Sequence, residues 1–241
     1  MAGAVITVAG DPIPAAPPRD VAELQARAAR VRERIAAAGG DPAAITLVAV
    51  TKGLPVGLAA LALEAGLEDL GENYAQELLS KHEQLGAAAA RVRWHFIGQL
   101  QRNKVAKLAP VVDVWETVDR VELGTAIARH APGATVFAQV NVSGEPQKGG
   151  CLPDAAPDLV AALRDLGLAV RGLMTVGATG APEAARDGFR TLRRLADRLG
   201  LVDCSMGMSG DLEVAVAEGA TIVRVGTALM GRRTTTSYVR D

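Results

Sequence analysis

The chain alternates eight times between short strand-like runs and helical segments, and this rhythm constrains the fold more than any other feature. The strand-like runs lie at residues 45–50, 67–72, 92–98, 111–118, 135–143, 168–176, 201–207 and 221–226. Helical segments lie between them, near 56–66, 73–88, 102–109, 119–130, 153–166, 181–199 and 209–218. Several runs are apolar at both alternating positions, as is typical of parallel strands covered on both faces. Eight such units predict an α/β protein with a single (β/α)8 TIM barrel, and a doubly wound open sheet is the alternative.

An additional helix is predicted ahead of the first strand. Its apolar residues recur at helical spacing: Val21, Leu24, Ala28, Val31 and Ile35. Asp20 is a candidate N-cap, and Gly39-Gly40 ends the helix. Residues 1–19 form a Pro-rich leader without the basic start of a signal peptide, and we expect it to be disordered. Residues 20–241 are then expected to form one domain, because a chain of 241 residues suits a single α/β barrel.

Composition narrows the classes of function. The formal net charge is −1, so the overall charge gives no support for a face that binds nucleic acid or an anionic membrane. Cys151 and Cys204 form no metal-ligand spacing and favour a reducing compartment, and no apolar stretch approaches the roughly 18 residues of a membrane span. We therefore expect a cytoplasmic protein, a monomer or weak dimer, without a metal site and without nucleic-acid or membrane partners.

A lone lysine follows the first strand. Lys52 shares its parity with Val48 and Val50, so its side chain points either into the barrel mouth or, as an ordinary loop lysine, into solvent. A desolvated lysine at the mouth would have a lowered pKa and a free amine able to form a Schiff base. That role requires a binding site for an aldehyde nearby.

Two loops near the end of the chain have the features of an anion site. Ser209 and Gly210 precede the helix that begins near Asp211, and Gly226-Thr227 follow the eighth strand directly. Glycines let backbone N–H groups approach an anion, hydroxyls donate to it, and barrels often bind phosphate with this pair of loops. Each loop alone favours a plainer interpretation, an N-cap at Ser209 and a tight turn at Gly226, but the two together favour phosphate. Strands one and eight are neighbours in a closed barrel, which places both loops beside Lys52.

Other polar residues near the strand ends have two interpretations each. Arg224 either points into the barrel, where it needs a partner, or pairs with a helix carboxylate outside it. Asn73 either caps the helix after the second strand or faces the site. His95 is expected to be a hydrogen-bonded core residue, because no second residue makes it part of a triad. Lys148, in the polar loop 143–150, is expected to be a solvated charge.

Six stretches together resemble the family of pyridoxal phosphate homeostasis proteins. They are LVAVTK, GENYAQEL, WHFIGQLQRNK, NVSGEPQKGG, GLMTVG and SMGMSGDLEVAVAEGATIVRVGTALMG, and they span residues 47–231 in the order of the family. The family is similar in its barrel to fold-type III pyridoxal-phosphate enzymes such as alanine racemase. The resemblance implies a barrel of that type over residues 20–241, with pyridoxal 5′-phosphate as its cofactor.

The resemblance also assigns seven residues to the cofactor. Lys52 would hold it covalently as an internal aldimine, and Arg224 would face its pyridine nitrogen. The other five would surround the ring and the phosphate: Asn73 beside the ring, Ser209, Gly226 and Thr227 at the phosphate, and Met206 packed nearby. The family often has Ser at the position of Thr51, a difference that keeps the hydroxyl group.

The function implied by the resemblance is homeostasis of pyridoxal 5′-phosphate (vitamin B6) without evident turnover, and no residue is assigned a catalytic role. An arginine at the pyridine nitrogen makes the ring a weaker electron sink than an aspartate would, which suits holding the cofactor. Transient contact with client apo-enzymes is a further expectation. Two alternatives stay open: a racemase-like enzyme that uses the same lysine, and a Schiff-base aldolase acting on sugar phosphates.

Overall fold

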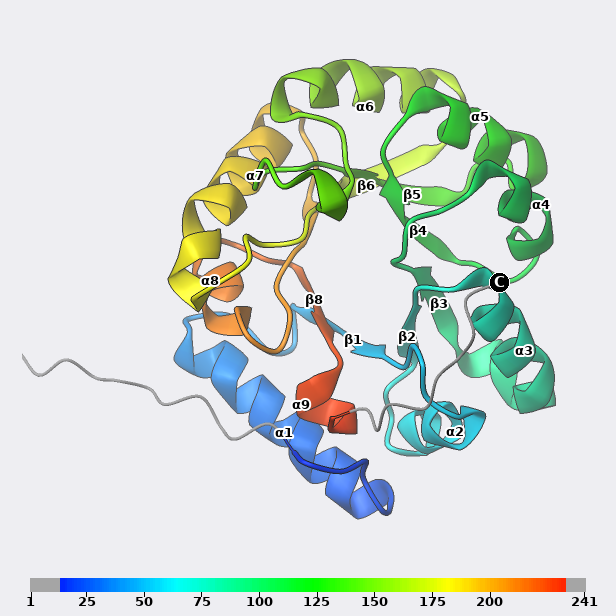
Figure 1. Ribbon diagram of the computed structural model, residues 1–241, viewed down its shortest axis with the longest axis vertical. Coiled ribbons are helices and arrows are strands. Elements are labelled where there is room, and N and C mark those ends of the chain that lie inside the picture. Colours follow the sequence, from blue (N-terminus) through cyan, green and yellow to red (C-terminus); the bar gives the residue numbers. More distant parts are fainter. Residues whose placement is uncertain (1–13, 233–241) are drawn as a thin grey trace, which may run out of the picture.

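The protein is a closed barrel of eight parallel strands in chain order, as a computed structural model that describes residues 14–232 shows (Figure 1). The strands are β1 (Thr46–Val50), β2 (Asp69–Glu72), β3 (Arg93–Phe96), β4 (Val114–Val118), β5 (Thr135–Gln139), β6 (Ala169–Met174), β7 (Asp203–Ser205) and β8 (Ile222–Val225). Pairing of β1 with β8, from Thr46 opposite Ile222 to Ala49 opposite Val225, closes the barrel. Every strand lies within the range predicted from the sequence, and the (β/α)8 barrel is confirmed over the open sheet.

Helices surround the strands as an outer ring (Figure 1). They are α1 (Val21–Ala37), α2 (Val56–Glu64), α3 (Ala75–Leu85), α4 (Val105–Leu108), α5 (Val121–His130), α6 (Ala156–Asp165), α7 (Arg186–Arg198), α8 (Leu212–Ala217) and α9 (Thr227–Met230). Short 3-10 turns, among them Arg102–Lys104 and Pro146–Lys148, join some of them to the strands. The helix α9 was not predicted, because four residues are too few to show a periodicity. Between residues 14 and 232, no helix combines the length and the apolar character needed to cross a membrane.

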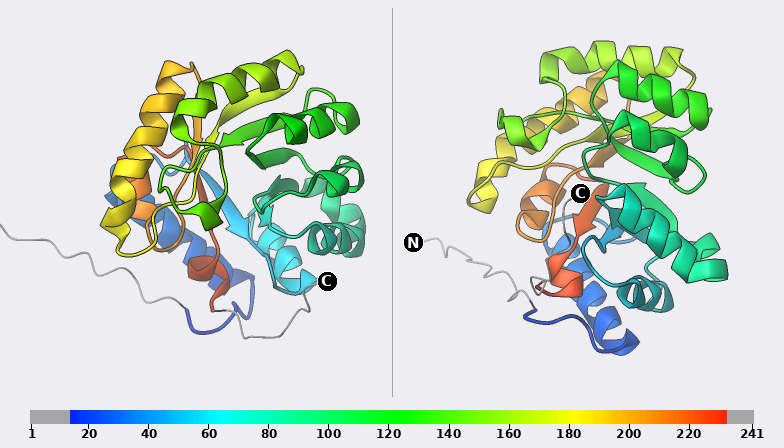
Figure 2. Two further views of the ribbon diagram at one scale, coloured as in Figure 1. Left: turned by 45° about the horizontal axis from the view of Figure 1, so that its top comes forward. Right: turned by 45° about the vertical axis from the view of Figure 1, so that its right-hand side comes forward.

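The additional helix α1 lies in the ring between α8 and α2 and also packs against α9 (Figures 1 and 2). Asp20 caps it as predicted, since its side chain accepts a hydrogen bond of 2.8 Å from the backbone N–H of Glu23. Residues 1–13 of the predicted leader and residues 233–241 of the predicted domain lie outside the described residues. The expected disorder of the leader and the domain boundaries therefore stay predictions.

Both faces of the strands are buried, as parallel strands under a ring of helices should be. The largest fully buried side chains are Trp94, Trp115, Phe96 and Phe189, which belong to the main core cluster. A smaller cluster joins residues of five different strands: Val48, Val114, Phe137, Met174 and Ile222. Since five strands meet there, this cluster fills the inside of the barrel, and the remaining inward positions are left for polar side chains.

Candidate functional site

A cavity of about 340 Å³ lies at the carboxyl ends of the strands. This volume is within the roughly 300–1,000 Å³ that small-molecule sites occupy. Six of the seven residues assigned to the cofactor line the cavity together: Lys52, Asn73, Ser209, Arg224, Gly226 and Thr227. The structure thus brings the lysine after β1, the loops after β7 and β8 and the inward arginine of β8 to one place.

The seventh residue, Met206, does not line the cavity. It is fully buried in the main core, whereas Met208 is partly exposed and lines the cavity instead. Gly207 separates the two methionines with a φ of 94°, and a Cβ atom there would lie 2.5 Å from the Cβ of Ala215. The backbone turns at a position that only glycine fits, and this turn sends the two side chains to different environments.

A buried group of four residues, the lysine-support cluster (Thr51, Glu72, Glu77 and Lys81), lies beside the turn that carries Lys52. The Lys81 ammonium donates to Glu72 Oε1 at 2.6 Å and to the carbonyl oxygen of Thr51 at 2.7 Å. The Thr51 hydroxyl donates to the same Glu72 oxygen at 2.6 Å. Burial raises the pKa of the Glu72 carboxyl, although Lys81 acts in the opposite direction. No pattern in the sequence marked Lys81 as a buried residue.

Asn73 follows β2 and lines the cavity, so its interpretation as a helix cap is wrong. The helix α3 has Tyr74 at its N-cap position, without a side-chain capping bond. Asn73 Oδ1 is buried and has no hydrogen-bond partner within residues 14–232. A buried amide oxygen without a partner is costly, and here it belongs to a residue that lines the cavity. Asn73 is therefore suited to bind a polar group of a ligand.

Arg224 points into the barrel and is almost completely buried. Its guanidinium donates to Ser205 Oγ at 2.6 Å and to the carbonyl oxygen of Thr175 at 2.7 Å, and it lies 3.9 Å from Glu116 Oε2. Burial lowers the pKa of Arg224, while the charges of Glu116 and Asp211 oppose that change. Of the two interpretations from sequence, the structure confirms the first: Arg224 points into the barrel and is held there by Ser205 and Thr175.

A second buried group, the arginine-support cluster (Asp69, His95, Glu116 and Ser205), extends from Arg224 across the barrel. Ser205 Oγ donates to Glu116 Oε2 at 2.6 Å, and Glu116 Oε1 lies 2.6 Å from His95 Nδ1. His95 Nε2 lies 2.9 Å from Asp69 Oδ1. Burial alone would lower the pKa of His95, but its bonds to Asp69 and Glu116 outweigh burial and raise the pKa to about 9. His95 is the hydrogen-bonded core residue that was predicted, with two acidic partners that the sequence did not indicate.

The loops after β7 and β8 meet at the edge of the cavity. Ser209 Oγ accepts a hydrogen bond of 3.2 Å from the backbone N–H of Ala228 in α9. Asp211, not Ser209, occupies the N-cap position of α8, so the plainer interpretation of Ser209, as an N-cap, is wrong. Because Ser209 Oγ only accepts in this bond, its hydroxyl hydrogen is left to donate to an anion. The Thr227 hydroxyl and the backbone at Gly226 lie at the same edge of the cavity.

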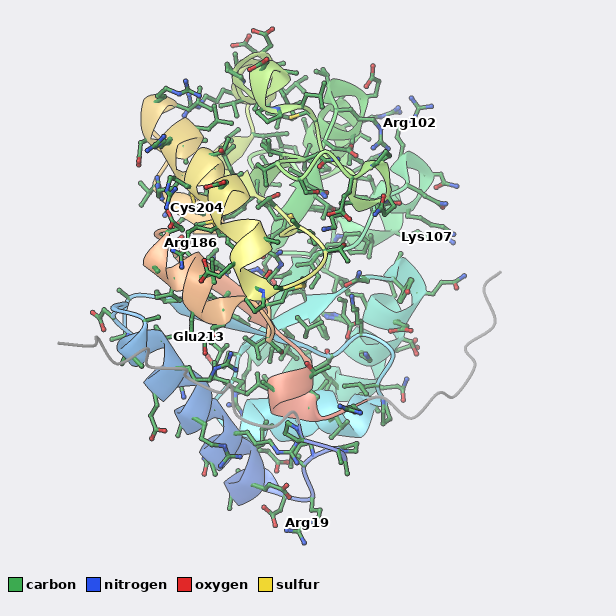
Figure 3. The ribbon with its side chains drawn as sticks, turned by 60° about the vertical axis from the view of Figure 1, so that its left-hand side comes forward. Arg19, Arg102, Lys107, Arg186, Cys204 and Glu213 are labelled. Carbon is green, nitrogen blue, oxygen red and sulfur yellow. The ribbon has the colours of Figure 1, made fainter. Side chains whose placement is uncertain are left out.

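The helix α1 holds both of these loops in place. Arg34 donates to the carbonyl oxygen of Ser209 at 3.0 Å and pairs with Glu213 at 2.6 Å. Figure 3 shows Glu213 on α8, at the side that faces α1. Arg27 is buried and donates to the carbonyl oxygen of Leu229 in α9 at 2.9 Å. The additional helix therefore supports the anion-suited edge of the cavity from outside the barrel.

Lys148 is not the solvated charge that was predicted. Its side chain is only 12% exposed and pairs with Glu145 at 2.6 Å, and it also donates to the carbonyl oxygen of Gly177. These contacts fasten the loop 143–150 to the loop after β6. Together with Asp211, Lys148 lines a neighbouring cavity of about 310 Å³.

Comparisons with known proteins agree with the barrel fold. The family model described as alanine racemase, N-terminal domain, matches residues 20–234. The pyridoxal phosphate homeostasis protein of Pseudomonas aeruginosa is 45% identical over 214 residues, which cover 86% of this chain and 92% of that protein. The mouse protein of the same name is 36% identical over 87% of this chain and 85% of its own. The solved structure of PipY from Synechococcus elongatus with pyridoxal phosphate bound is 32% identical, with a TM-score of 0.73, and the match covers 83% of this chain and all of that one.

Proposed function

Since the chain belongs to the family of pyridoxal phosphate homeostasis proteins, we propose that it binds pyridoxal 5′-phosphate in the described cavity and serves the intracellular homeostasis of that cofactor. One observation carries the proposal: Lys52, Arg224 and the loops after β7 and β8 line the same cavity. They offer an amine, a fixed cation and an anion-suited edge, which match an aldehyde, a pyridine nitrogen and a phosphate.

The donor set around the cavity fits the cofactor group by group. Ser209 and Thr227 offer hydroxyls to the phosphate, and the backbone at Gly226 can approach it closely because no side chain intervenes. Arg224 has a guanidinium held by Ser205 and Thr175, which suits an unprotonated ring nitrogen. Asn73 Oδ1, which has no hydrogen-bond partner in the described part of the chain, supports a place for that amide beside the ring.

Lys52 is proposed as the covalent attachment point. The cofactor supplies an aldehyde carbon, to which the Lys52 nitrogen forms a C=N bond while the carbonyl oxygen leaves as water. For this step the Lys52 amine has to lose its proton, because only the neutral amine is a nucleophile. The retention of the cofactor then combines this bond with the hydrogen bonds around the phosphate.

We propose a carrier or regulator rather than an enzyme. Arg224 cannot hand a proton to the ring nitrogen as readily as an acid can, so the ring stays a weak electron sink. Transient transfer to client apo-enzymes is part of this proposal. Incubation of the loaded protein with alanine or serine should give no steady turnover, measured by chiral chromatography. Steady racemisation or deamination would instead support the racemase-like alternative.

Borohydride trapping tests the attachment point. Wild-type protein mixed with pyridoxal 5′-phosphate should acquire a visible absorption band, and reduction should leave the adduct on Lys52, identified by peptide mass spectrometry. Lys52→Ala should abolish the adduct. Lys107→Ala is the matched control, because Lys107 is exposed and points outward from α4 in Figure 3. An adduct that persists on another lysine in Lys52→Ala would refute the assignment.

The phosphate end has a separate test. Replacing both Ser209 and Thr227 by Ala should weaken retention of the cofactor during gel filtration, because two hydroxyl donors are lost. Far-UV circular dichroism should stay unchanged. Unaltered affinity in a folded double variant would mean that the phosphate binds elsewhere.

A further inference from the structure

A buried lysine that the proposed function does not use lies behind the cavity. Lys81, on α3, is 4% exposed, although lysine is one of the residues that are almost never fully buried without a partner. Its ammonium has three acceptors around it: Glu72 at 2.6 Å, the Thr51 carbonyl at 2.7 Å and Glu77 at 3.8 Å. One of these acceptors is the backbone of the residue directly before Lys52.

Both chain neighbours of Lys52 are fastened by the same cluster. On one side, Thr51 is held through its carbonyl by Lys81 and through its hydroxyl by Glu72. On the other side, the backbone N–H of Gly53 donates to Glu77 Oε2 at 2.7 Å. Gly53 has a φ of 68°, in the left-handed region that glycine adopts without strain. The turn 51–53 is thus held at both ends by side chains of β2 and α3.

Efficient packing does not require charged residues at these positions. Apolar residues of similar volume would fill the space with less desolvation of charge, and replacement of buried ion pairs by such residues is often neutral or stabilising. The cluster also leaves Glu72 Oε2 without a hydrogen-bond partner among the described residues. What the charged cluster provides, and an apolar one would not, is a set of directional bonds to the backbone on either side of Lys52.

We propose that Lys81 is a positioning residue, which with Glu72 and Glu77 holds the Lys52 turn so that the Lys52 amine meets the aldehyde of the bound cofactor. This inference rests on the proposed function. It separates two stages of binding: capture of the phosphate and ring depends on the far side of the cavity, and bond formation depends on the placement of Lys52. A loosened turn should therefore slow bond formation and leave non-covalent binding intact.

Two ligands distinguish these stages. Pyridoxal 5′-phosphate has the aldehyde, whereas pyridoxine 5′-phosphate has an alcohol in its place and binds without forming a C=N bond. In Lys81→Met, the rate at which the visible band appears with the aldehyde should fall roughly ten- to a hundredfold, as for other misplaced reacting groups. The dissociation constant of pyridoxine 5′-phosphate, measured by calorimetry, should stay close to that of the wild type.

A second variant keeps the test independent of folding. Lys81→Met leaves Glu72 without its cation, so the protein is also measured as the double variant Glu72→Gln with Lys81→Met, which removes both charges. Glu77→Leu breaks the bond from Gly53 and the longer ion pair with Lys81 but keeps the Lys81–Thr51 bond, so it should also slow band formation, by a smaller factor. Glu83→Leu is the matched control, because Glu83 is an exposed residue on the same helix. It should change neither the rate of band formation with pyridoxal 5′-phosphate nor the dissociation constant of pyridoxine 5′-phosphate.

The outcomes separate this inference from the proposed function. If the folded variants form the band at the wild-type rate, or lose affinity for both ligands by the same factor, Lys81 has only a structural role and the inference is wrong. If wild-type protein forms no adduct on Lys52 at all, the proposed function fails and the inference fails with it. A slow band with unchanged pyridoxine 5′-phosphate binding supports both.

Discussion

The two buried clusters support opposite sides of one cavity and treat their central carboxylates differently. In the lysine-support cluster, Glu72 has a single close cation, Lys81, and one of its oxygens has no hydrogen-bond partner within residues 14–232. In the arginine-support cluster, Glu116 has a partner on each oxygen, His95 on one and Ser205 on the other, and Arg224 is nearby. Burial is nearly complete for both carboxylates.

The pKa values of the two glutamates move in opposite directions as a result. Burial raises the pKa of Glu72 despite Lys81. For Glu116, burial acts in the same sense, but the hydrogen bond and charge of His95 and the charge of Arg224 outweigh it and lower the pKa. The comparison teaches that burial alone does not decide the charge of an interior carboxylate; the surrounding cations do, His95 and Arg224 for Glu116 against Lys81 for Glu72. Glu116 is thus the better stabilised of the two negative charges, and Glu72 the less stabilised one.

The largest effect is expected from removing the better stabilised charge. Glu116→Gln leaves His95 and Arg224 without their shared anion, and breaking a buried pair in this way costs about 3–5 kcal/mol of unfolding free energy. Urea denaturation at pH 7 measures the loss. Glu122→Gln, an exposed neighbour on α5, is the control and should change stability by less than about 0.5 kcal/mol. Similar losses in both variants would show that Glu116 is not the centre of its cluster.

The titration of His95 gives the next largest effect. Its folded pKa of about 9 lies above the ordinary value of 6.5, so the folded state holds the proton more tightly than the unfolded chain. The stabilisation is fully present below pH 6.5 and is lost as the pH rises through about 9, a change of about 3 kcal/mol. The difference in unfolding free energy between wild type and His95→Gln, followed from pH 6 to pH 10, should shrink across that window. A difference independent of pH would mean that His95 is neutral in the folded protein.

Glu72→Gln should cost less than Glu116→Gln, toward the lower end of the roughly 3–5 kcal/mol for breaking a buried pair, because Lys81 keeps Glu77 at 3.8 Å and the Thr51 carbonyl at 2.7 Å. The sign of its pH dependence is opposite to that of a stabilised carboxylate. The raised pKa of Glu72 means that the folded state binds the proton more tightly, so wild-type stability from this group falls as the pH rises above the ordinary value of 4.5. Glu72→Gln should remove this fall in urea denaturation series above pH 4.5. A cost as large as that of Glu116→Gln would contradict the contrast between the clusters.

The smallest loss of unfolding free energy is expected for an ion pair nearer the surface. Arg34 and Glu213 form a pair whose side chains are 16% and 35% exposed, so solvent screens it more than either cluster. Arg34→Ala should reduce the unfolding free energy by about 1 kcal/mol or less. The measurement uses the same urea series, with exposed Arg30→Ala on the same helix as the control. A loss larger than that of Glu72→Gln would show that the contact of Arg34 with the Ser209 loop contributes more to stability than the buried ion pair of Glu72.

The fold could be predicted closely from the sequence, and the site in part. Strand positions followed from apolar runs and helices from periodicity, and the neighbourhood of β1 and β8 in a closed barrel placed Lys52 beside the loops at Ser209 and Gly226. Six of the seven assigned residues then line one cavity. Met206 does not line that cavity, because the turn at Gly207 directs it into the core and leaves Met208 at the cavity. The burial of Lys148 was missed because its partner Gly177 is 29 residues away.

The supporting clusters could not be predicted at all. Glu116 and Ser205 are 89 residues apart, and Thr51 and Lys81 are 30 apart, so no local pattern links them. Lys81 and Glu77 have the ordinary helical spacing of an exposed ion pair. Only the docking of α3 against β1 and β2 makes one of them a buried cation.

The sequence by itself determined which segments become strands and helices, because local propensity and the periodicity of apolar residues act over a few neighbours. It also determined which chemical groups stand at the strand ends, among them Lys52, Ser209 and Arg224. The tertiary structure alone decided which of these groups are buried and which partner each one meets. That decision sets the charge of Glu72, Glu116 and His95, because a pKa depends on the surrounding dipoles and charges, and barrel closure brings these from strands far apart in the chain.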